Sequence, residues 1–427
     1  MFAAFYVACA NDPITNRGNG GAGGKGGSDV ADSGETGDAG ADATSGSGGS
    51  IGGSAGHGGS VATGGKGGSI DSPGGEGGVS AAGEAGEAGA SGGGPIDSCG
   101  GVTVGVKSKF PAPPTTGVAK PAGTPGGLTV INWAAFKGAV SFTFDDNLQS
   151  QVTHYAELNA VGVPMTFYLV GSTFSNSTAT WISAFNDGHE LGNHTMHHCK
   201  VDGTQCGWGA FTTIDDEIDA DTAKMKLLLG VPDVYTFASP NGDNGWAAPA
   251  GQRFALNRGV YDNPTGVMPN DTTNAYNLPC HIANLDEKAV GGFNTITDDV
   301  RARGAWRIIL AHNVDPNITD YGYNPVQLAE IVGAMTYAKG LQDVWIDKMV
   351  TIGAYWRAQK ALTDAIVTTS GTSKTYSWTL PDHFPPGQFL RVKVDGGKLK
   401  QCDTELTWDD HGYYEIALDA GSVTLSP

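Results

Sequence analysis

The sequence predicts an α/β protein, a distorted (β/α) barrel followed by a small antiparallel β-sandwich. Between residues 139 and 362, short apolar runs alternate with helical patterns, which is typical of parallel βα units, and so many units favour a barrel. After residue 366 only short strands separated by turns follow one another. We therefore expect the barrel at residues 102–366 and the sandwich at residues 367–427.

The strands of the barrel are expected where apolar runs end in polar residues. In chain order they are residues 139–144, 163–170, 189–193, 234–238, 306–311 and 344–346. Amphipathic patterns predict helices at residues 148–161, 181–185, 215–229, 325–337 and 350–362. Thr213 is the predicted N-cap of the third of these helices.

The sandwich is predicted from four short strands. They are expected at residues 375–380, 389–394, 413–418 and 422–425. Trp378 and Trp408 could bind sugar there, but we expect both to pack in the core. Residues 102–127, rich in Pro and Gly, are predicted to be a lead-in to the barrel without elements of their own.

The first hundred residues are not expected to form a core. No Phe, Tyr or Trp occurs between Val7 and Lys109, and 33 of the 66 glycines lie in residues 1–100. Such a segment buries too little apolar surface to offset the backbone entropy lost on folding. We therefore predict a disordered, Gly-rich linker at residues 10–101.

Residues 1–9 are apolar and have no basic residue ahead of them, so they do not form a complete signal peptide. Val7-Ala8-Cys9 resembles the end of a bacterial lipobox, in which the cysteine is lipidated. We interpret residues 1–9 as the remnant of a longer signal or lipobox, with Cys9 as the lipidation candidate; the alternative is a stray apolar N-terminus. The expected localisation is a secreted protein or a cell-surface lipoprotein of a bacterium.

The charge of the chain argues against two classes of partner. The formal net charge is −19, from 25 Lys and Arg against 44 Asp and Glu, without a basic run. Contacts to nucleic-acid phosphates and to anionic membrane surfaces both need clustered basic residues. We expect no nucleic-acid partner, and membrane attachment only through Cys9.

The six cysteines point to an oxidising compartment. Cys199 and Cys206 are close enough in sequence to close a small loop as a disulfide, which we favour over a metal site because zinc sites usually have shorter spacings and a second pair. The pairing of the other four cysteines stays open.

Three groups of polar residues follow predicted strands, at the end where a βα barrel has its active site. Asp145 and Asp146 follow the first strand; one carboxylate could bind a metal while the other handles protons, although an isolated pair would be read as a helix cap. His194 and His198, spaced i and i+4, could bind one cation from a single helical turn. His312 follows a buried strand and by itself would be read as a core histidine.

The order of these motifs resembles the polysaccharide deacetylases, the NodB-homology enzymes of carbohydrate esterase family four. The likeness covers about residues 138–360. The matching motifs are Thr143-Phe-Asp-Asp146, Gly188-His-Glu-Leu-Gly-Asn-His194, His194-Thr-Met-His-His198, Pro240-Asn-Gly242, Leu310-Ala-His312 and Val344-Trp-Ile346.

The resemblance implies a role for each motif residue. Asp146, His194 and His198 would hold a divalent metal, usually zinc and in some members cobalt or manganese. Asp145 would be the general base, and His312 the general acid, for which we expect a carboxylate partner that raises its pKa. The backbone N–H of Asn241 would stabilise the oxyanion.

Three further positions bear on the site: Ala238, Asp315 and His197. Many family members have an arginine two residues before the motif proline, where this chain has Ala238; Arg253 and Arg258 are the candidates to supply that charge. Asp315 is the acidic residue nearest to His312 in sequence. His197, between the two predicted ligands, is expected to point away from the metal. The substrate-binding residues cannot be assigned from the sequence.

The resemblance implies metal-dependent removal of acetyl groups from a carbohydrate polymer or oligosaccharide. We expect a substrate containing N-acetylglucosamine, such as a chitin-like polymer or peptidoglycan. An esterase acting on acetylated xylan is the first alternative, because amide and ester cleavage share this chemistry. A catalytically weak carbohydrate-binding protein is the second.

Overall fold

The computed structural model describes residues 98–99, 101–285, 292–319 and 323–427. The predicted lipidation site Cys9 and nearly all of the predicted linker lie outside these residues. Among the described helices, none combines the length and the apolar character that a bilayer crossing requires.

A curled parallel sheet forms the barrel, as the alternation of strands and helices predicts. Its strand order is β8-β7-β6-β5-β4-β10-β9, and β11 pairs with the first half of β4. The bounds are β4 Gly138–Phe144, β5 Thr166–Leu169, β6 Glu190–Asn193, β7 Thr236–Ala238, β8 Leu256–Arg258, β9 His281–Ile282, β10 Trp306–Ala311 and β11 Val344–Ile346. Every pairing in this sheet is parallel, so the carboxyl ends of the strands meet at one edge.

Helices follow most of these strands. They are α1 Gln149–Thr153, α2 Tyr155–Ala160, α3 Thr178–Asn186, α4 Ile214–Leu229, α5 Ala247–Gly251, α6 Gly292–Arg303, α7 Leu328–Leu341 and α8 Met349–Thr363. Short 3-10 helices are η1 Asn132–Ala135, η2 Phe174–Ser177, η3 Pro240–Gly242, η4 Asn244–Trp246 and η6 Leu418–Ala420. The helix predicted at residues 148–161 is wrong as a single element, because it is interrupted at His154 (φ −103°, ψ 16°).

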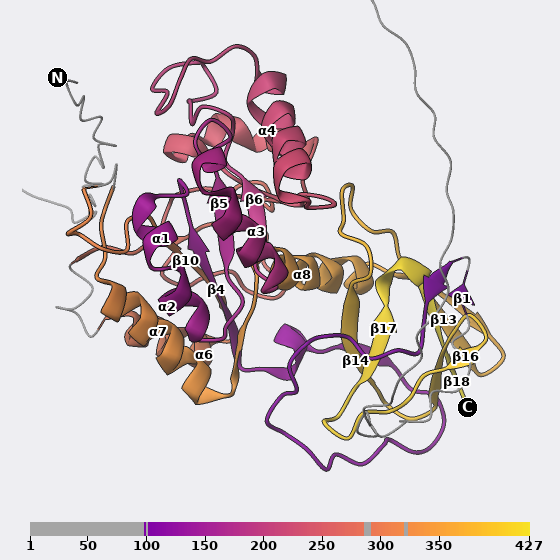
Figure 1. Cartoon of the computed structure of the whole chain (residues 1–427). Coiled ribbons are helices and arrows are strands. Elements are labelled where there is room, and N and C mark those ends of the chain that lie inside the picture. The colour runs from indigo at the N-terminus through magenta and orange to yellow at the C-terminus, as the bar shows by residue number, and fades with distance from the viewer. Residues whose placement is uncertain (1–97, 100, 286–291, 320–322) are drawn as a thin grey trace, which may run out of the picture. The chain divides into compact units, whose positions relative to one another are not determined.

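Two strands and two helices of the barrel were missed by the sequence analysis. Strands β8 and β9 are only three and two residues long, so an alternating pattern has no room to show. Helix α5 is a single short turn, and α6 has a polar sequence with a narrow buried side. Helices α6 and α7 lie side by side (Figure 1); α6 contacts β4 and β10, and α7 contacts β11.

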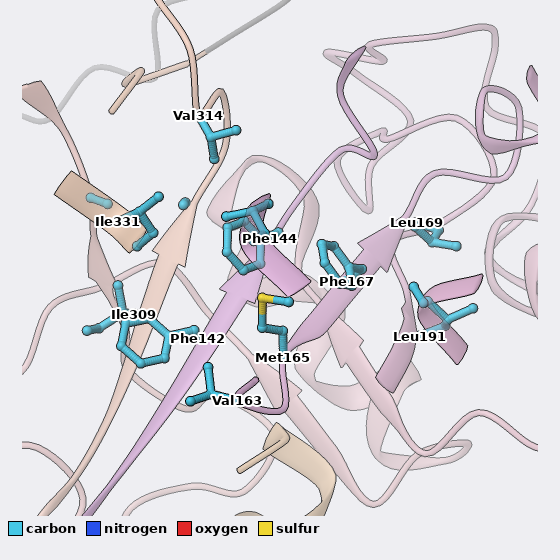
Figure 2. Packing of buried hydrophobic residues seen from close by; sticks show 14 of the residues in the cluster. Phe142, Phe144, Val163, Met165, Phe167, Leu169, Leu191, Ile309, Val314 and Ile331 are labelled. Carbon is cyan, nitrogen blue, oxygen red and sulfur yellow. The ribbon is translucent and has the colours of Figure 1, made fainter. Parts of the chain in front are cut away.

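Strand β4 is the centre of the core. All seven of its residues are buried. Phe142 and Phe144 point to the same side, where Phe144 stacks on Phe167 of β5 with ring centroids 5.1 Å apart (Figure 2). Side chains alternate between the two faces of a strand, so the intervening Thr143 points the other way. The packing on β4 fixes the strand end that carries the two aspartates.

The C-terminal part forms the predicted antiparallel sandwich. One sheet has the order β12-β13-β18-β15-β16 and the other β17-β14-β3. The bounds are β3 Leu128–Val130, β12 Ile366–Ser370, β13 Ser373–Ser377, β14 Phe389–Val394, β15 Lys398–Gln401, β16 Thr404–Glu405, β17 Tyr414–Ala417 and β18 Ser422–Ser426; a separate pair is β1 Ser98–Cys99 and β2 Val102–Thr103.

The lead-in predicted at residues 102–127 without elements is wrong at its start, because Val102–Thr103 forms β2 and pairs with β1 at the end of the predicted linker. The strand after this lead-in also has a role that the sequence did not predict. Strand β3 pairs with β14, so residues before the barrel complete a sheet of the sandwich. The indole N–H groups of Trp378 and Trp408 donate to the carbonyls of Leu418 and Val118. Trp378 is buried and Trp408 is partly buried against the same hydrophobic cluster, so both pack, as expected.

Candidate active site

The turn after β4 presents two adjacent aspartates. The backbone N–H of Asp145 donates to Ala311 O at the end of β10 (3.1 Å). The buried amide of Gln151 donates to the carbonyls of Asp145 (2.6 Å) and His312 (2.9 Å). Asp146 has φ +72°, which few residues other than glycine adopt. These contacts fix the ends of β4 and β10 against each other.

His194 follows β6 directly and is completely buried. Its Nδ1 donates to the carbonyl of Ala238 at the end of β7 (2.8 Å). This hydrogen bond leaves Nε2 unprotonated on the neutral ring, and Nε2 lies 3.4 Å from Asp146 Oδ1. A backbone carbonyl bound to the second ring nitrogen is the usual way in which a metal-binding histidine is oriented.

His198 reaches the same carboxylate from a loop. Its Nε2 lies 3.4 Å from Asp146 Oδ1. The helical turn predicted for this pair is wrong: Thr195 and His198 both have positive φ, and Thr195 Oγ1 accepts from the backbone N–H of His198 (2.9 Å). The loop brings the two rings together, with centroids 4.8 Å apart, without helical geometry.

His197 points elsewhere, as expected. Its Nδ1 lies 2.8 Å from Oε1 of Glu217, a buried residue of α4, and its backbone N–H donates to the other oxygen of the same carboxylate (2.9 Å). Glu217 thereby anchors the loop from outside the site. Glu217 could not be predicted from the sequence, because its position within an amphipathic helix gives no sign of its distant partner.

The three predicted metal ligands fit a zinc ion. One ligand atom from each of Asp146, His194 and His198 lies within 4.8 Å of the others. Two atoms about 2.0–2.1 Å from one zinc ion at a tetrahedral angle are about 3.4 Å apart, and both histidines lie at that distance from Asp146 Oδ1. Asp146 Oδ1 is buried and makes no hydrogen bond within the described residues, as a metal ligand would.

Opposite charges share this buried site. Burial disfavours ionisation of Asp146, but the surrounding rings of His198, His194 and His312 outweigh burial, so its pKa lies well below the ordinary value. Burial lowers the pKa of His198 to about 4, which leaves its ring neutral and able to bind a metal near neutral pH.

Asp145 is paired with an arginine from β8. Oδ2 of Asp145 accepts from the buried guanidinium of Arg258, whereas Oδ1 is buried without a hydrogen-bond partner among the described residues. Of the two candidate arginines, Arg253 instead binds Asp215 (2.5 Å) and Asp219 (2.7 Å) of α4. Arg258 is therefore the arginine that the structure brings to the site.

His312 lies at the end of β10, but its surroundings differ from those predicted. Burial lowers the pKa of His312 against the attraction of Asp146 and Asp145, so the expected rise in its pKa is wrong. Asp315 pairs with His154 at 3.0 Å, and Nδ1 of His312 has no hydrogen-bond partner among the described residues. The ring of Tyr323 meets His312 edge-on, with centroids 5.5 Å apart.

Asn241 lies in η3, directly after β7, with φ +55°. Its side-chain amide donates to the carbonyls of His198 (3.2 Å) and Gln205 (3.1 Å). The turn that carries Asn241 is therefore tied to the metal-binding loop. The oxyanion role of its backbone N–H stays a prediction.

A disulfide closes the loop beyond His198. Cys199 and Cys206 are bonded, with their sulfur atoms 1.95 Å apart. Gly207 N donates to His198 O (3.2 Å), and the ring of Trp208 lies edge-on to His198 at 5.5 Å. Cys402 is also disulfide-bonded, and Cys280 is free and buried.

The comparison with protein families confirms the resemblance found in the sequence. Residues 135–252 match the family model of polysaccharide deacetylases. This segment contains β4 to β7, Asp145, Asp146 and both histidine ligands, whereas β10 with His312 lies beyond it. No curated protein matches the sequence of this chain.

The solved structures that the chain matches have low sequence identity to it. A candidate polysaccharide deacetylase from Mycobacterium smegmatis is 18% identical, covers 57% of this chain and 96% of its own, and has a TM-score of 0.40. For the peptidoglycan deacetylase PdaC from Bacillus subtilis these values are 16%, 53%, 95% and 0.33. For a cobalt complex of a family 4 acetyl xylan esterase from Clostridium thermocellum they are 19%, 50%, 89% and 0.30.

Proposed function

We propose, from the premise that residues 135–252 belong to the polysaccharide deacetylase family, that this chain is a metal-dependent hydrolase removing acetyl groups from a carbohydrate polymer. The observation that carries the proposal is the convergence of Asp146, His194 and His198 beside the arginine-paired Asp145. A sheet that only bound sugar would have no use for two buried metal ligands, a third that is half-buried and an adjacent carboxylate.

Two residues of the chain carry out the proton transfers, one as acceptor and one as donor. Asp145 accepts a proton from the attacking water, through the oxygen that Arg258 does not hold. His312, protonated before the bond to the sugar breaks, donates that proton to the leaving nitrogen or oxygen of the sugar, and the backbone N–H of Asn241 donates to the acetyl oxygen as negative charge develops there. A divalent ion, zinc by our proposal, would lower the pKa of the water and polarise the acetyl carbonyl when bound at the three ligands.

The substrate that we propose contains N-acetylglucosamine, as a chitin-like polymer or peptidoglycan. A neutral glycan suits a chain with a net charge of −19 better than an anionic polymer does. Acetylated xylan is the second candidate, because the same residues can cleave an ester. We further propose that the protein is exported, either released or anchored through Cys9; the Cys199–Cys206 bond supports an oxidising compartment.

Acetate release by the full chain tests the proposal. The substrates are chitooligosaccharides, peptidoglycan and acetylated xylan, each assayed with added zinc or cobalt and with chelator. We expect turnover that disappears with chelator and in Asp145→Asn, which removes the base but keeps the three ligands. Tight metal binding without turnover on any substrate would refute the enzyme and leave a carbohydrate-binding protein as the better interpretation.

A further inference from the structure

We infer that Arg258 is the positioning residue of the general base, and that strand β8 has taken over a task for which the related sequences use the neighbouring strand. The inference rests on the proposed function. It states that Arg258 holds Oδ2 of Asp145 and so leaves Oδ1 as the oxygen that takes the proton from water.

The two oxygens of Asp145 have different surroundings. Oδ2 accepts from Arg258 and lies 3.6 Å from His194 Nε2, whereas Oδ1 is buried and has no hydrogen-bond partner among the described residues. A buried carboxylate oxygen without a partner is destabilising unless it is needed for binding or chemistry. The arrangement therefore assigns one oxygen to orientation and the other to reaction.

Arg258 itself is fixed from several sides. Its side chain has no exposed surface, and one terminal nitrogen donates to Gly259 O (3.1 Å) and contacts the thiol of Cys280 (3.6 Å). The guanidinium lies over the ring of Tyr168, 5.3 Å from its centroid. Each contact restricts the rotation of the planar group, so Arg258 can hold Asp145 in one orientation.

The register of the sheet explains how an arginine on β8 can replace the arginine that related sequences have on β7. Ala238 of β7 is paired directly with Arg258 of β8, and laterally paired residues of parallel strands point to the same face. Ala238 stands where many family members have their arginine. Because its side chain is a single methyl group, the neighbouring strand can supply the guanidinium on that face.

The matched control is Arg253. It binds Asp215 and Asp219 on the outer side of α4 and contacts no residue of the site. Its replacement removes the same charge from the chain without touching Asp145. A difference between the two arginines therefore reports on position and not on net charge.

The first experiment measures kcat and KM for acetate release, and metal affinity, in the full chain. We expect Arg258→Ala to lower kcat by about 100-fold, with metal affinity and KM nearly unchanged, because the base is misplaced while the ligands stay. Arg253→Ala should leave kcat as it is. Adding Ala238→Arg to Arg258→Ala should restore at least about a tenth of the lost kcat, since the new guanidinium starts from the paired position.

The second experiment needs no metal and no substrate. Thermal unfolding of the chelated protein is compared for Arg258→Ala, Asp145→Ala and the double variant. If the two residues are coupled, Arg258→Ala lowers Tm strongly by itself and much less when Asp145 is already alanine. If Arg258→Ala does not fold, Arg258→Lys replaces it in both experiments.

The outcomes separate the inference from the proposed function. Unchanged kcat in Arg258→Ala, or additive Tm shifts, would overturn the role of Arg258. An inactive wild type would overturn the proposed function, while the unfolding measurement would still test the pairing of Arg258 with Asp145.

Discussion

At the scale of the residue, the site is a set of buried charged groups whose partners come from different strands. Asp146 follows β4, His194 follows β6, and Arg258 ends β8. Each is almost fully buried, so removing one partner leaves another without compensation, which is far more costly than the loss of a surface ion pair. The predictions at this scale therefore concern single side chains.

The adjacent histidines His197 and His198 allow a matched test of the metal site. His198→Ala removes a predicted ligand and should weaken zinc binding by at least about 100-fold. His197→Ala removes a ring that binds Glu217 instead, so it should weaken zinc binding much less. Competition with a coloured chelator measures both. Equal losses of affinity would show that the loop, and not the His198 ring, determines binding.

His189 predicts an acid sensitivity of folding that is independent of the metal. Its Nδ1 accepts from the backbone N–H of Met165 (3.1 Å) and Nε2 lies 3.0 Å from Asn159 Oδ1, so the ring is neutral in the fold. Burial, against the attraction of Asp187, lowers its pKa from 6.5 to about 4. Between pH 6.5 and 4 the unfolded chain binds the proton and the folded chain does not, so stability falls as the pH falls, by about 3 kcal/mol at most.

The test of this prediction compares wild type with His189→Asn in chemical denaturation at pH 7 and pH 4.5. An asparagine oxygen can replace the accepting nitrogen but does not titrate. The variant should lose less stability on acidification. Glu190, whose pKa is raised by burial, contributes in the opposite direction, but it is present in both proteins. The same loss in both would assign the acid sensitivity to other groups.

At the scale of the element, a loop and a helix together position the second half of the site. The loop from His194 to Trp208 carries both histidine ligands, and α4 packs behind it with Glu217 facing His197. The sequence predicted the helix well, because Thr213 caps it as expected: its hydroxyl accepts from Asp216 N at 3.0 Å. The helical turn predicted for the loop was wrong because Thr195 and His198 have positive φ. Glycine is the usual sequence sign of positive φ, and neither position has one.

The cap of α4 is testable with a neighbouring control. Thr213→Ala should lower the free energy of unfolding by about 1 kcal/mol, because the N-terminal N–H of the helix loses its acceptor. Thr212→Ala changes an exposed threonine just before the cap and should have little effect. Urea denaturation gives both values. An equal loss for the two would mean that the cap does not stabilise α4.

At the scale of the molecule, the barrel and the sandwich share elements. Strand β3 precedes the barrel in sequence yet pairs with β14 of the sandwich. The buried guanidinium of Arg391, from β14, donates to Ala134 O (2.8 Å) in η1 and to Glu415 (2.9 Å). Tyr355 of α8 donates to Ile131 O (2.6 Å), which adds a contact between α8 and the segment after β3. The pairing of β3 with β14 and the hydrogen bond from Arg391 to Ala134 cross the predicted boundary at residues 366 and 367.

This sharing predicts that the barrel does not fold without the sandwich. A chain ending at residue 366 leaves β3 and the apolar face beneath it unpaired, so we expect an insoluble or uncooperatively unfolding protein. Residues 102–427 should unfold in one transition in calorimetry. A soluble 102–366 fragment with native circular dichroism and zinc affinity would show that the two parts fold independently.

The sequence by itself determined the fold class and the chemical identity of the site. Long buried strands such as β4 and β10 have continuous apolar patterns, and Asp145, Asp146, His194, His198 and His312 follow strands whose ends meet at one edge of a parallel sheet. Those signals are local, because a strand pattern and the motif at its end lie within a few residues. The structure places all five where that reasoning expects them, while their catalytic roles stay predictions.

Only the tertiary structure decided which distant residues complete the site. Arg258 ends a strand of three residues, which is too short to show an alternating apolar pattern. Its lateral pairing with Ala238 nevertheless brings its guanidinium into a hydrogen bond with Asp145. Asp315, next to His312 in sequence, binds His154 instead. Strand β3 joins a sheet more than 250 residues away in the chain. In each case sheet register and packing determine the partner. Both depend on residues far apart in the sequence, so the spacing of residues within a motif does not reveal the partner.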